Sequence, residues 1–408
     1  MSVETLSFGC RLNTVETEAM RRLADRDGRR RIVVNTCAVT EEAGRQARKA
    51  IRRAARADPE AEIVVTGCGA EVETAAYRAM PEVARLIGNA EKLRPAAWMG
   101  DAVGPGAVMA ARHADTAPVA TMADHTRTFV PVQNGCDHRC TFCVIPFGRG
   151  HSRSVEAGAV VEQVAWVVEA GGREVVLTGV DLTAYGKDLP TGSPSLGGLV
   201  LRILREVPAL PRLRLSSIDS VEVDEDLLAA IADESRLMPH LHLSLQAGDD
   251  LILKRMKRRH SRAESIRFCE AARAARPGLV FGADLIAGFP TETDAQFANT
   301  LALVEECGLT HLHVFPYSAR PGTPAARMPA VAPDRIRDRA ARLRRAGDEA
   351  RSRHLADQVG RRVSVLAERG GLGRAEDFTP VRLPEGVAAG SMLDVTIAGH
   401  DGTRLIAA

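Results

Sequence analysis

The stretch Cys136-Asp137-His138-Arg139-Cys140-Thr141-Phe142-Cys143 places three cysteines at a C-x3-C-x2-C spacing, shortly after a strand-like run at residues 129–132. Thiolates this close in sequence can wrap one compact soft-metal site, for which iron–sulfur and zinc are the usual occupants. A structural zinc site needs a fourth ligand, and His138 inside the loop is a candidate. A four-iron cluster held by three cysteines instead leaves one iron open, as catalytic metal sites do. The spacing favours the iron–sulfur interpretation.

This cysteine loop stands at the head of a long alternation of strands and helices. The strand-like runs are residues 129–132, 174–178, 213–216, 241–245, 280–286 and 311–315. The stretches between them are amphipathic, and one begins with a capping box formed by Ser261 and Glu264. Six strand and helix units predict a partial (β/α)6 barrel, shorter than a closed eight-unit barrel, with its site at the carboxyl ends of the strands.

A shorter alternation precedes the barrel. Strand-like runs at residues 5–8, 31–34 and 62–65 are separated by helical patterns at 14–27 and 40–58, which predicts a parallel α/β domain. Each of the three runs is followed by a cysteine, namely Cys10, Cys37 and Cys68. Because the carboxyl ends of parallel strands meet at one edge of the sheet, we expect these thiols to converge.

The remaining segments complete a three-domain prediction. Residues 91–125 are rich in Ala, Gly and Pro and are predicted to be a linker or a loose end of the first domain. A charged helix at 334–358 is followed by strand-like runs, which predict a small all-β barrel. These runs are residues 363–366, 378–383 and 393–397. The predicted domains are residues 1–105, 122–355 and 358–408.

The composition is that of an ordinary globular protein. The chain has 408 residues, of which 45% are hydrophobic and 26% charged, so it is not disordered, collagenous or disulfide-stapled. Its net charge of +2 means that any nucleic-acid surface must be local. No run is long and apolar enough to span a membrane, and the first residues lack the features of a signal peptide. We expect a cytoplasmic protein without a membrane partner, in which clustered cysteines serve as metal or redox groups.

The cysteine spacing of the central loop resembles the signature of the radical S-adenosylmethionine enzymes, and further motifs extend the resemblance to the methylthiotransferases among them. In the first domain these motifs are Gly9-Cys10, Asn35-Thr36-Cys37 and Thr66-Gly67-Cys68. In the barrel they are Gln133-Asn134-Gly135-Cys136, Pro146-Phe147-Gly148-Arg149-Gly150, Leu177-Thr178-Gly179-Val180-Asp181, Leu215-Ser216-Ser217, His242-Leu243-Ser244-Leu245-Gln246, Arg255-Met256-Lys257-Arg258 and Asp284-Leu285-Ile286-Ala287-Gly288-Phe289-Pro290. The carboxy-terminal segment resembles the RNA-binding TRAM module of that family.

This resemblance implies two [4Fe–4S] clusters and S-adenosylmethionine. One cluster, on Cys136, Cys140 and Cys143, would cleave S-adenosylmethionine to a radical that abstracts a hydrogen atom from the substrate. The other, on the three amino-terminal cysteines, would hold the sulfur for transfer. The resemblance also implies S-adenosylmethionine contacts at Phe142, Ser216, Gln246, Ile286 and Gly288. Asp181 and Asp219 follow strands where a carboxylate could engage ribose or amine groups, and their roles stay open.

Relatives in this family modify isopentenyladenosine in tRNA, threonylcarbamoyladenosine in tRNA, or an aspartate of a ribosomal protein. Three cysteine motifs resemble the threonylcarbamoyladenosine subfamily, namely Phe8-Gly9-Cys10-Arg11-Leu12-Asn13, Asn35-Thr36-Cys37-Ala38-Val39-Thr40 and Gln133-Asn134-Gly135-Cys136-Asp137-His138-Arg139-Cys140. The isopentenyl subfamily usually has Met-Asn after the first of these motifs and Ser-Ile-Arg after the second, and neither is present. The resemblance therefore implies methylthiolation at adenine C2 of threonylcarbamoyladenosine-37, beside the anticodon. The isopentenyladenosine enzyme, and a zinc-dependent RNA-binding protein, are the alternatives.

The expected partners are the tRNA anticodon stem-loop, an electron donor and a sulfur source. Basic residues crowd two predicted helices and could bind phosphate, although such runs are often only solvated faces. The first set is Arg45, Arg48, Lys49, Arg52, Arg53 and Arg56. The second is Arg335, Arg337, Arg339, Arg342, Arg344, Arg345, Arg351 and Arg353.

Two cysteines and four histidines fall outside these motifs. Cys269 and Cys307 have no partner at ligand spacing and are expected to be small buried hydrophobic residues. The histidines alternate on predicted strands and are expected to pack on the barrel wall. They are His240, His242, His311 and His313.

Overall fold

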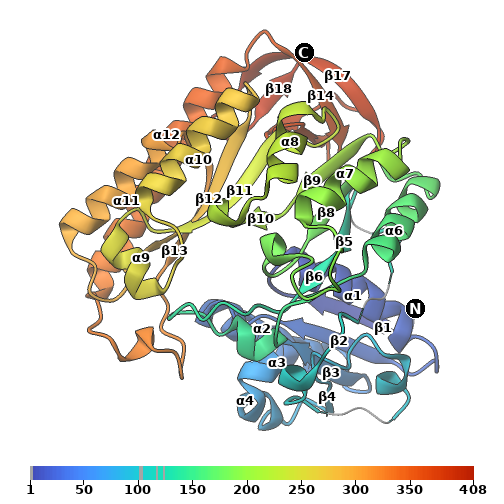
Figure 1. The fold of residues 1–408 in the computed structure, drawn as a ribbon. Helices are drawn as coiled ribbons and strands as arrows, with labels where there is room; N and C mark the ends of the chain where they lie inside the picture. Colours follow the sequence, from blue (N-terminus) through green and yellow to red (C-terminus); the bar gives the residue numbers. More distant parts are fainter. Residues whose placement is uncertain (1–2, 101–103, 116–117, 123–124) are drawn as a thin grey trace.

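The computed structural model describes residues 3–100, 104–115, 118–122 and 125–408. Three parts follow one another along the chain, coloured from blue to red in Figure 1. The predicted domain boundaries stay predictions, and residues 1, 2, 101–103 and 123–124 of those ranges lie outside the described residues, as do residues 116–117 of the predicted linker.

The amino-terminal part is a four-stranded parallel sheet in the order β1-β2-β3-β4. Its strands are β1 (Val3–Ser7), β2 (Arg31–Thr36), β3 (Glu62–Gly67) and β4 (Arg85–Leu86), and its helices are α1 (Arg11–Ala24), α2 (Glu41–Ala57), α3 (Cys68–Val72) and α4 (Thr74–Arg78). Every residue of β2 is buried, because its Ile-Val-Val run is covered on both faces of the sheet. The parallel α/β prediction is confirmed, whereas β4 was missed because two residues give no periodic signal.

Part of the predicted linker is packed against this sheet. Trp98, in a short 3-10 helix (Pro95–Trp98), is 1% exposed and belongs to the apolar cluster of Val33 and Val64. Its indole Nε1 donates to the carbonyl oxygen of Lys92 at 2.9 Å, and Lys92 is itself buried. The prediction of a loose end is therefore wrong for residues 92–98, where a single large aromatic side chain outweighs the Ala, Gly and Pro content around it.

The central part is the predicted open barrel of six parallel strands. A sheet of β5 (Thr128–Pro131), β8 (Glu174–Thr178) and β9 (Arg212–Leu215) continues, one residue after β9, into a sheet of β10 (Ser217–Ile218), β11 (His240–Gln246), β12 (Val280–Ala287) and β13 (Leu309–Pro316). The helices around it are α6 (Ala157–Glu169), α7 (Leu196–Glu206), α8 (Glu225–Asp233), α9 (Asp250–Met256), α10 (Arg262–Ala275), α11 (Asp294–Glu306) and α12 (Pro333–Asp357). The capping box of Ser261 and Glu264 is confirmed at the start of α10.

Alternation along the barrel strands separates an apolar outer face from a polar interior. The outward residues of β8, β9 and β11, such as Leu177, Leu215 and Leu243, are buried in one cluster with the surrounding helices. Their neighbours in sequence therefore face the barrel interior. His242 is one of these, and its Nε2 lies 2.9 Å from Asp284 Oδ1, so the interior histidines form polar contacts as well as packing. Cys269 is fully buried beside Cys307, as expected for small apolar residues.

The carboxy-terminal part is a closed barrel in the order β14-β15-β16-β18-β17, shown red in Figure 1. Its strands are β14 (Arg362–Ala367), β15 (Leu372–Ala375), β16 (Pro380–Arg382), β17 (Met392–His400) and β18 (Leu405–Ala407). The sequence missed β15 and β18, and the predicted strand at 378–383 begins with a turn, in which Phe378 has φ +72°. Among the described residues, no helix combines the length and apolarity that crossing a bilayer requires.

Candidate metal and cofactor site

The three amino-terminal cysteines stand where the parallel strands end. Cys10 caps the start of α1 after β1, Cys37 follows β2, and Cys68 begins α3 immediately after β3. Gly9 has φ +102°, and a Cβ at this position would lie 2.7 Å from Cys37 Sγ, so only glycine lets the two turns approach. Burial, together with the charges of Cys68 and Cys10, raises the pKa of Cys37 to about 11. The structure thus brings the three thiols together, with Cys10 the exposed member.

The second cysteine triad lies in the loop between β6 (Gln133–Asn134) and α5 (Ile145–Arg149); β6 pairs with β7 (Arg153–Ser154). Cys136, Cys140 and Cys143 all line one pocket. Burial raises the pKa of Cys143 to about 12, so its thiolate needs a compensating positive charge. Bound iron ions would supply that charge, and three cysteines would leave one coordination position without a protein ligand.

The two triads adjoin through α3 and α5. Arg149, at the end of α5, donates from Nε to Cys68 Sγ at 3.1 Å. Gly148 packs on Cys68, where a Cβ would come within 3.2 Å of the cysteine Cβ. Asn89 Nδ2 donates to the Gly148 carbonyl oxygen at 2.5 Å and lies 3.6 Å from Cys68 Sγ. Arg149 therefore ties the segment that follows the second triad directly to a cysteine of the first.

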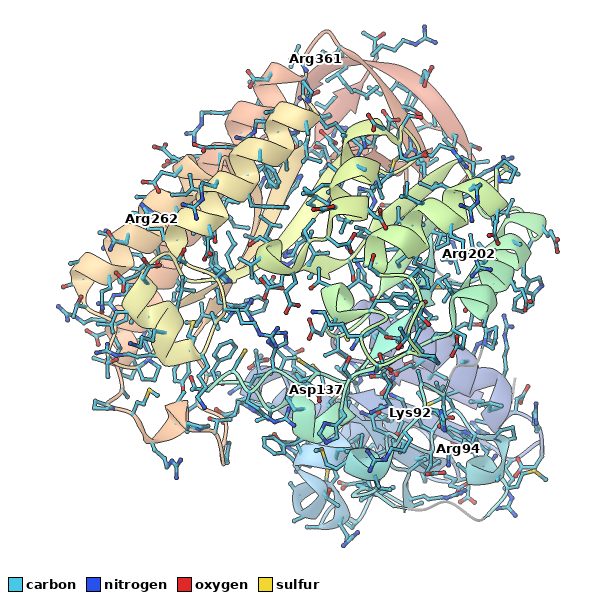
Figure 2. All side chains as sticks on the ribbon, in the orientation of Figure 1. Lys92, Arg94, Asp137, Arg202, Arg262 and Arg361 are labelled. Atoms are coloured by element: carbon cyan, nitrogen blue, oxygen red, sulfur yellow. The ribbon has the colours of Figure 1, made fainter. Side chains whose placement is uncertain are left out.

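Arg149 is held by a buried ion-pair network that the sequence did not reveal. Its Nη1 and Nη2 donate to the two carboxylate oxygens of Glu16 at 2.8 and 2.9 Å, and Nη2 also donates to Asn13 Oδ1. Lys92, labelled in Figure 2, donates to the same carboxylate at 2.6 Å. Burial would raise the pKa of Glu16, but Arg149 and Lys92 lower it to about 2. The sequence feature that could have indicated this network is Glu16 itself, a glutamate on the apolar face of α1 between Leu12 and Ala19.

The pocket beside the second triad carries opposite charges. Asp181 and Asp219 line it together with Arg258, whose Nη2 donates to Asp219 Oδ2 at 2.7 Å and whose Nη1 lies 3.6 Å from Cys140 Sγ. Asp219 Oδ1 and Arg258 Nε are buried without a hydrogen-bond partner among the described residues, and the nearest charged group to Asp219 Oδ1 that forms an ion pair with it is His260 Nδ1, at 3.7 Å. A buried unpaired acceptor and donor side by side fit a ligand that carries both an ammonium and a carboxylate group.

Three of the five predicted S-adenosylmethionine contacts lie on pocket walls. Phe142 and Gln246 line both this pocket and a second one, which Ile286 lines together with Val39 and Thr40 of the amino-terminal part. Phe142 meets the Phe289 ring edge-on, with 6.4 Å between centroids, which fixes its orientation.

The other two predicted contacts are not on the wall of either pocket. Ser216 is 7% exposed, and its neighbour Ser217 takes the position on the wall. Gly288 has φ +75°, and a Cβ there would come within 2.6 Å of Ile336 Cγ1 on α12. The contact with Ile336 and the left-handed backbone therefore explain why residue 288 is glycine, without a contact to S-adenosylmethionine.

His138 contacts two carboxylates, in a group of three side chains whose ligand atoms could also hold a metal ion. Its Nε2 lies 3.0 Å from Asp181 Oδ2 and 3.7 Å from Glu222 Oε1. Hydrogen bonds to these two carboxylates raise the pKa of His138 to about 9, so the ring is protonated at neutral pH. A protonated imidazole has no free lone pair for zinc. The described geometry therefore does not favour His138 as a fourth zinc ligand.

Replacing Gly135 by alanine is expected to disorganise the loop that carries Cys136. Gly135 has φ +73°, and an added Cβ would lie 1.8 Å from the His151 carbonyl oxygen. The left-handed backbone alone costs roughly 1–3 kcal/mol for a residue with a side chain. Iron content after anaerobic reconstitution and the melting temperature should both fall. Gly158→Ala on α6, where no atom lies within 4 Å of the new Cβ, is the control and should retain both.

Two family profiles match the chain in consecutive segments. Residues 130–304 match the Radical SAM superfamily, and residues 2–88 match the Uncharacterized protein family UPF0004. The first match contains the triad of Cys136, Cys140 and Cys143, and the second contains the three amino-terminal cysteines.

Curated relatives match nearly the whole chain. The threonylcarbamoyladenosine tRNA methylthiotransferase MtaB of Rickettsia prowazekii is 46% identical over 399 residues, which covers 97% of this chain and 94% of the relative. The enzyme of the same name from Thermotoga maritima is 33% identical, covering 90% and 86%. The tRNA-2-methylthio-N(6)-dimethylallyladenosine synthase of Erythrobacter litoralis is 32% identical, covering 96% and 93%.

Solved structures share the fold at low sequence identity. The radical S-adenosylmethionine methyltransferase TsrM of Kitasatospora setae, with tryptophan and an S-adenosylmethionine analogue bound, superposes with a TM-score of 0.53 at 15% identity. That match covers 76% of this chain and 66% of the methyltransferase. The cobalamin-dependent radical enzyme OxsB matches with a TM-score of 0.51 at 11% identity, covering 86% of this chain and 54% of OxsB.

Proposed function

Since this chain belongs to the radical S-adenosylmethionine methylthiotransferases, in the subfamily that acts on threonylcarbamoyladenosine in tRNA, we propose that it inserts a methylthio group at C2 of that nucleoside. The observation that carries the substrate is the 46% identity to an MtaB enzyme over 97% of the chain. The isopentenyl-type relative is 32% identical. The chain is accordingly a tRNA-modifying transferase, and its nucleoside is N6-threonylcarbamoyladenosine-37 beside the anticodon.

A radical S-adenosylmethionine enzyme binds one [4Fe–4S] cluster and S-adenosylmethionine, and the residues present fit both. Cys136, Cys140 and Cys143, which line one pocket, would hold the cluster and leave one iron without a protein ligand. Together the two groups supply one-electron chemistry that can break a C–H bond without an acidic proton. The chain's own task is to orient and shield them.

The pocket residues divide that task by charge and shape. Arg258 would bind the carboxylate of the methionine moiety, and Asp219 Oδ1, which lacks a hydrogen bond, would accept from its ammonium group. Phe142 would support the adenine from one side, and Ile286 would line the same region. Gln246, with φ +65°, follows an irregularity in the pairing of β11 with β12, and so reaches both pockets.

A second [4Fe–4S] cluster on Cys10, Cys37 and Cys68 belongs to the proposal, as the holder of the sulfur to be transferred. The support for it is the convergence of three thiols at the edge of the sheet, next to the first triad. Arg149 and Asn89 both donate toward Cys68 Sγ. Hydrogen bonds to cluster sulfur atoms raise the reduction potential and hold the ligands in place. An electron donor and a sulfur source are the remaining proposed partners.

Nucleoside mass spectrometry of tRNA from a deletion strain tests the substrate. Methylthio-threonylcarbamoyladenosine should disappear, and the unmethylthiolated nucleoside should accumulate. Plasmid-borne wild-type protein should restore the product. Persistence of that product together with loss of the isopentenyl analogue would contradict the proposed substrate and favour the isopentenyladenosine enzyme.

Anaerobic reconstitution tests the metal content independently of the substrate. Two four-iron clusters predict about eight irons per chain and a broad visible absorption. Colourless protein with stoichiometric zinc would instead support the zinc-dependent RNA-binding alternative. Four irons would be consistent with the radical cluster alone and would contradict the second cluster.

A further inference from the structure

Four arginines from three parts of the chain surround one aromatic ring. The ring is Phe378, at the turn between β15 and β16 of the carboxy-terminal barrel. The guanidinium carbons of Arg11, Arg127, Arg214 and Arg374 lie 5.4, 5.3, 5.0 and 4.7 Å from its centroid. Four guanidinium groups that all lie this close to one ring repel one another, and their cation–π attraction to that ring cannot balance the repulsion.

Too few carboxylates are present to neutralise this cluster. Glu174 lies 2.8 Å from Arg214 and 3.6 Å from Arg212, a fifth arginine. Glu368 forms ion pairs with Arg127 at 2.6 Å and Arg374 at 3.7 Å. A third carboxylate, Glu376, acts on Arg212 through its charge, so five guanidinium groups share three carboxylates, two of them in ion pairs.

Several donors of the cluster lack a partner. Arg214 Nη1 and Arg212 Nε are buried without a hydrogen bond among the described residues, and both side chains are at most 1% exposed. Arg127 Nη1 and Arg374 Nε also lack a hydrogen bond, and Arg374 Nε lies 3.7 Å from Glu368 Oε2. Neither ring nitrogen of His240 has a hydrogen-bond partner among the described residues; burial lowers the pKa of this ring, so it is neutral and only one of the two nitrogens is a donor. His240 stacks on Phe378 with 5.2 Å between centroids. So many unpaired buried donors in one place indicate a bound acceptor, and the charge indicates an anion.

The cluster lies between the barrel interior and the amino-terminal cysteine triad. Arg214 and His240 are on the inward faces of β9 and β11, since their neighbours Leu213 and Leu241 belong to the outer apolar cluster. Arg11 directly follows Cys10, and its side chain reaches over Phe129 of β5 toward Phe378. An anion bound here is therefore within an arginine side chain's length of the backbone that holds the proposed sulfur-carrying cluster.

We propose that Arg11, Arg127, Arg214 and Arg374 bind the carboxylate of the threonyl group on the substrate adenine, and so select this substrate. This inference rests on the proposed function. The carboxylate is separated from C2 by the purine edge, the carbamoyl group and one carbon, a span comparable with an arginine side chain. Guanidinium groups bind carboxylates through paired hydrogen bonds. An isopentenyl group is apolar, and would leave the same donors unpaired, which is the stronger form of discrimination.

Binding of anticodon stem-loops to the reconstituted enzyme, without reductant, tests the proposal. The RNAs carry threonylcarbamoyladenosine, unmodified adenosine or isopentenyladenosine at position 37. The wild-type enzyme should bind the first RNA most tightly. Arg11→Met and Arg374→Met should each weaken binding of that RNA by roughly 10- to 100-fold, as loss of a hydrogen bond to a charged group implies, and change the other two little. Arg11→Lys should retain part of the preference.

Controls separate a specific role from a structural one. Arg361 is exposed on the same carboxy-terminal barrel and lies far from Asp137 of the cysteine loop in Figure 2, so Arg361→Met should bind all three RNAs as wild type does. Iron content checks that Arg11→Met leaves the neighbouring Cys10 competent. Arg374→Met provides the same test on a residue remote in sequence from every cysteine of the two triads.

Three results would overturn the proposal. Equal weakening of all three RNAs would assign the arginines to backbone phosphates. An unchanged preference in both variants would show that the cluster is only structural. If the wild-type enzyme bound the three RNAs equally, it would not recognise the carboxylate of the threonyl group. Failure of the proposed function would be seen in a different assay. When reductant is added, the enzyme would then convert the isopentenyladenosine RNA and not the threonylcarbamoyladenosine RNA.

Discussion

Cys10→Ala is expected to abolish methylthio transfer while leaving reductive cleavage of S-adenosylmethionine largely intact. Cys10 belongs to the triad at the sheet edge, whereas the pocket proposed to bind S-adenosylmethionine is lined by Cys136, Cys140 and Cys143. The loss of product should exceed the roughly 10- to 100-fold that outer-shell changes at metal sites cause, because a ligand itself is removed. Iron content should fall from about eight to about four per chain. Product and 5′-deoxyadenosine are measured in the same anaerobic reaction.

Cys269→Ala is the matched control for this prediction. Cys269 is fully buried in the outer cluster of the barrel and lines neither pocket, so this variant should keep both activities and its iron. If Cys10→Ala also lost cleavage of S-adenosylmethionine, while Cys269→Ala retained it, the division of labour between the two triads would be wrong.

The architecture could be predicted because it is encoded in local periodicity. Runs such as Arg31-Ile32-Val33-Val34 predict a strand buried on both faces, and the alternation with helices then requires a parallel sheet. Elements without such a signal were missed. β4 has two residues and exists because Val64 and Val65 offer a free edge, and β15 and β18 are short strands defined by their neighbours in the closed barrel.

The candidate site could be predicted only where its residues share a local spacing. The six cysteines follow strands or lie in one loop, and their positions are legible in the sequence. Arg149 and Glu16 are 133 positions apart, and no local pattern pairs them. The role of Arg258 depends on Asp219 across the barrel end, which is likewise a tertiary contact.

The basic stripes illustrate the same limit for the RNA partner. Arg339 of the second stripe is 2% exposed and binds the Glu292 carboxylate at 2.9 Å, so it stabilises the packing of α12 and is not available to RNA. Arg48 of the first stripe pairs with Glu73 at 2.7 Å. Arg52, Arg53 and Arg56 stay exposed on α2. The arginine cluster around Phe378 draws instead on single residues from distant segments, which no stripe predicts.

Glu16→Gln is expected to destabilise the amino-terminal part by about 3–5 kcal/mol, the usual result of removing one partner of a buried ion pair. Glu16 accepts from Arg149 and Lys92, and both cations are at most 2% exposed, so the neutral amide leaves two buried charges uncompensated. Urea unfolding followed by tryptophan fluorescence measures the change. Trp98, buried in this part, reports on it, whereas Trp166 is 42% exposed on α6.

The pH dependence distinguishes a lost charge from a packing defect. The carboxylate of Glu16 has a folded pKa of about 2, below its ordinary value of 4.5, so its contribution is fully present above pH 4.5 and is lost as the pH falls toward 2. The difference in stability between wild type and Glu16→Gln should therefore be constant near neutral pH and shrink below 4.5. Glu206→Gln, which breaks an exposed pair with Arg202, should leave the stability nearly unchanged, because solvent screens such a pair. If the difference in stability between wild type and Glu16→Gln stayed constant down to pH 3, the destabilisation would come from steric mismatch in the variant and not from loss of the ion pair with Arg149.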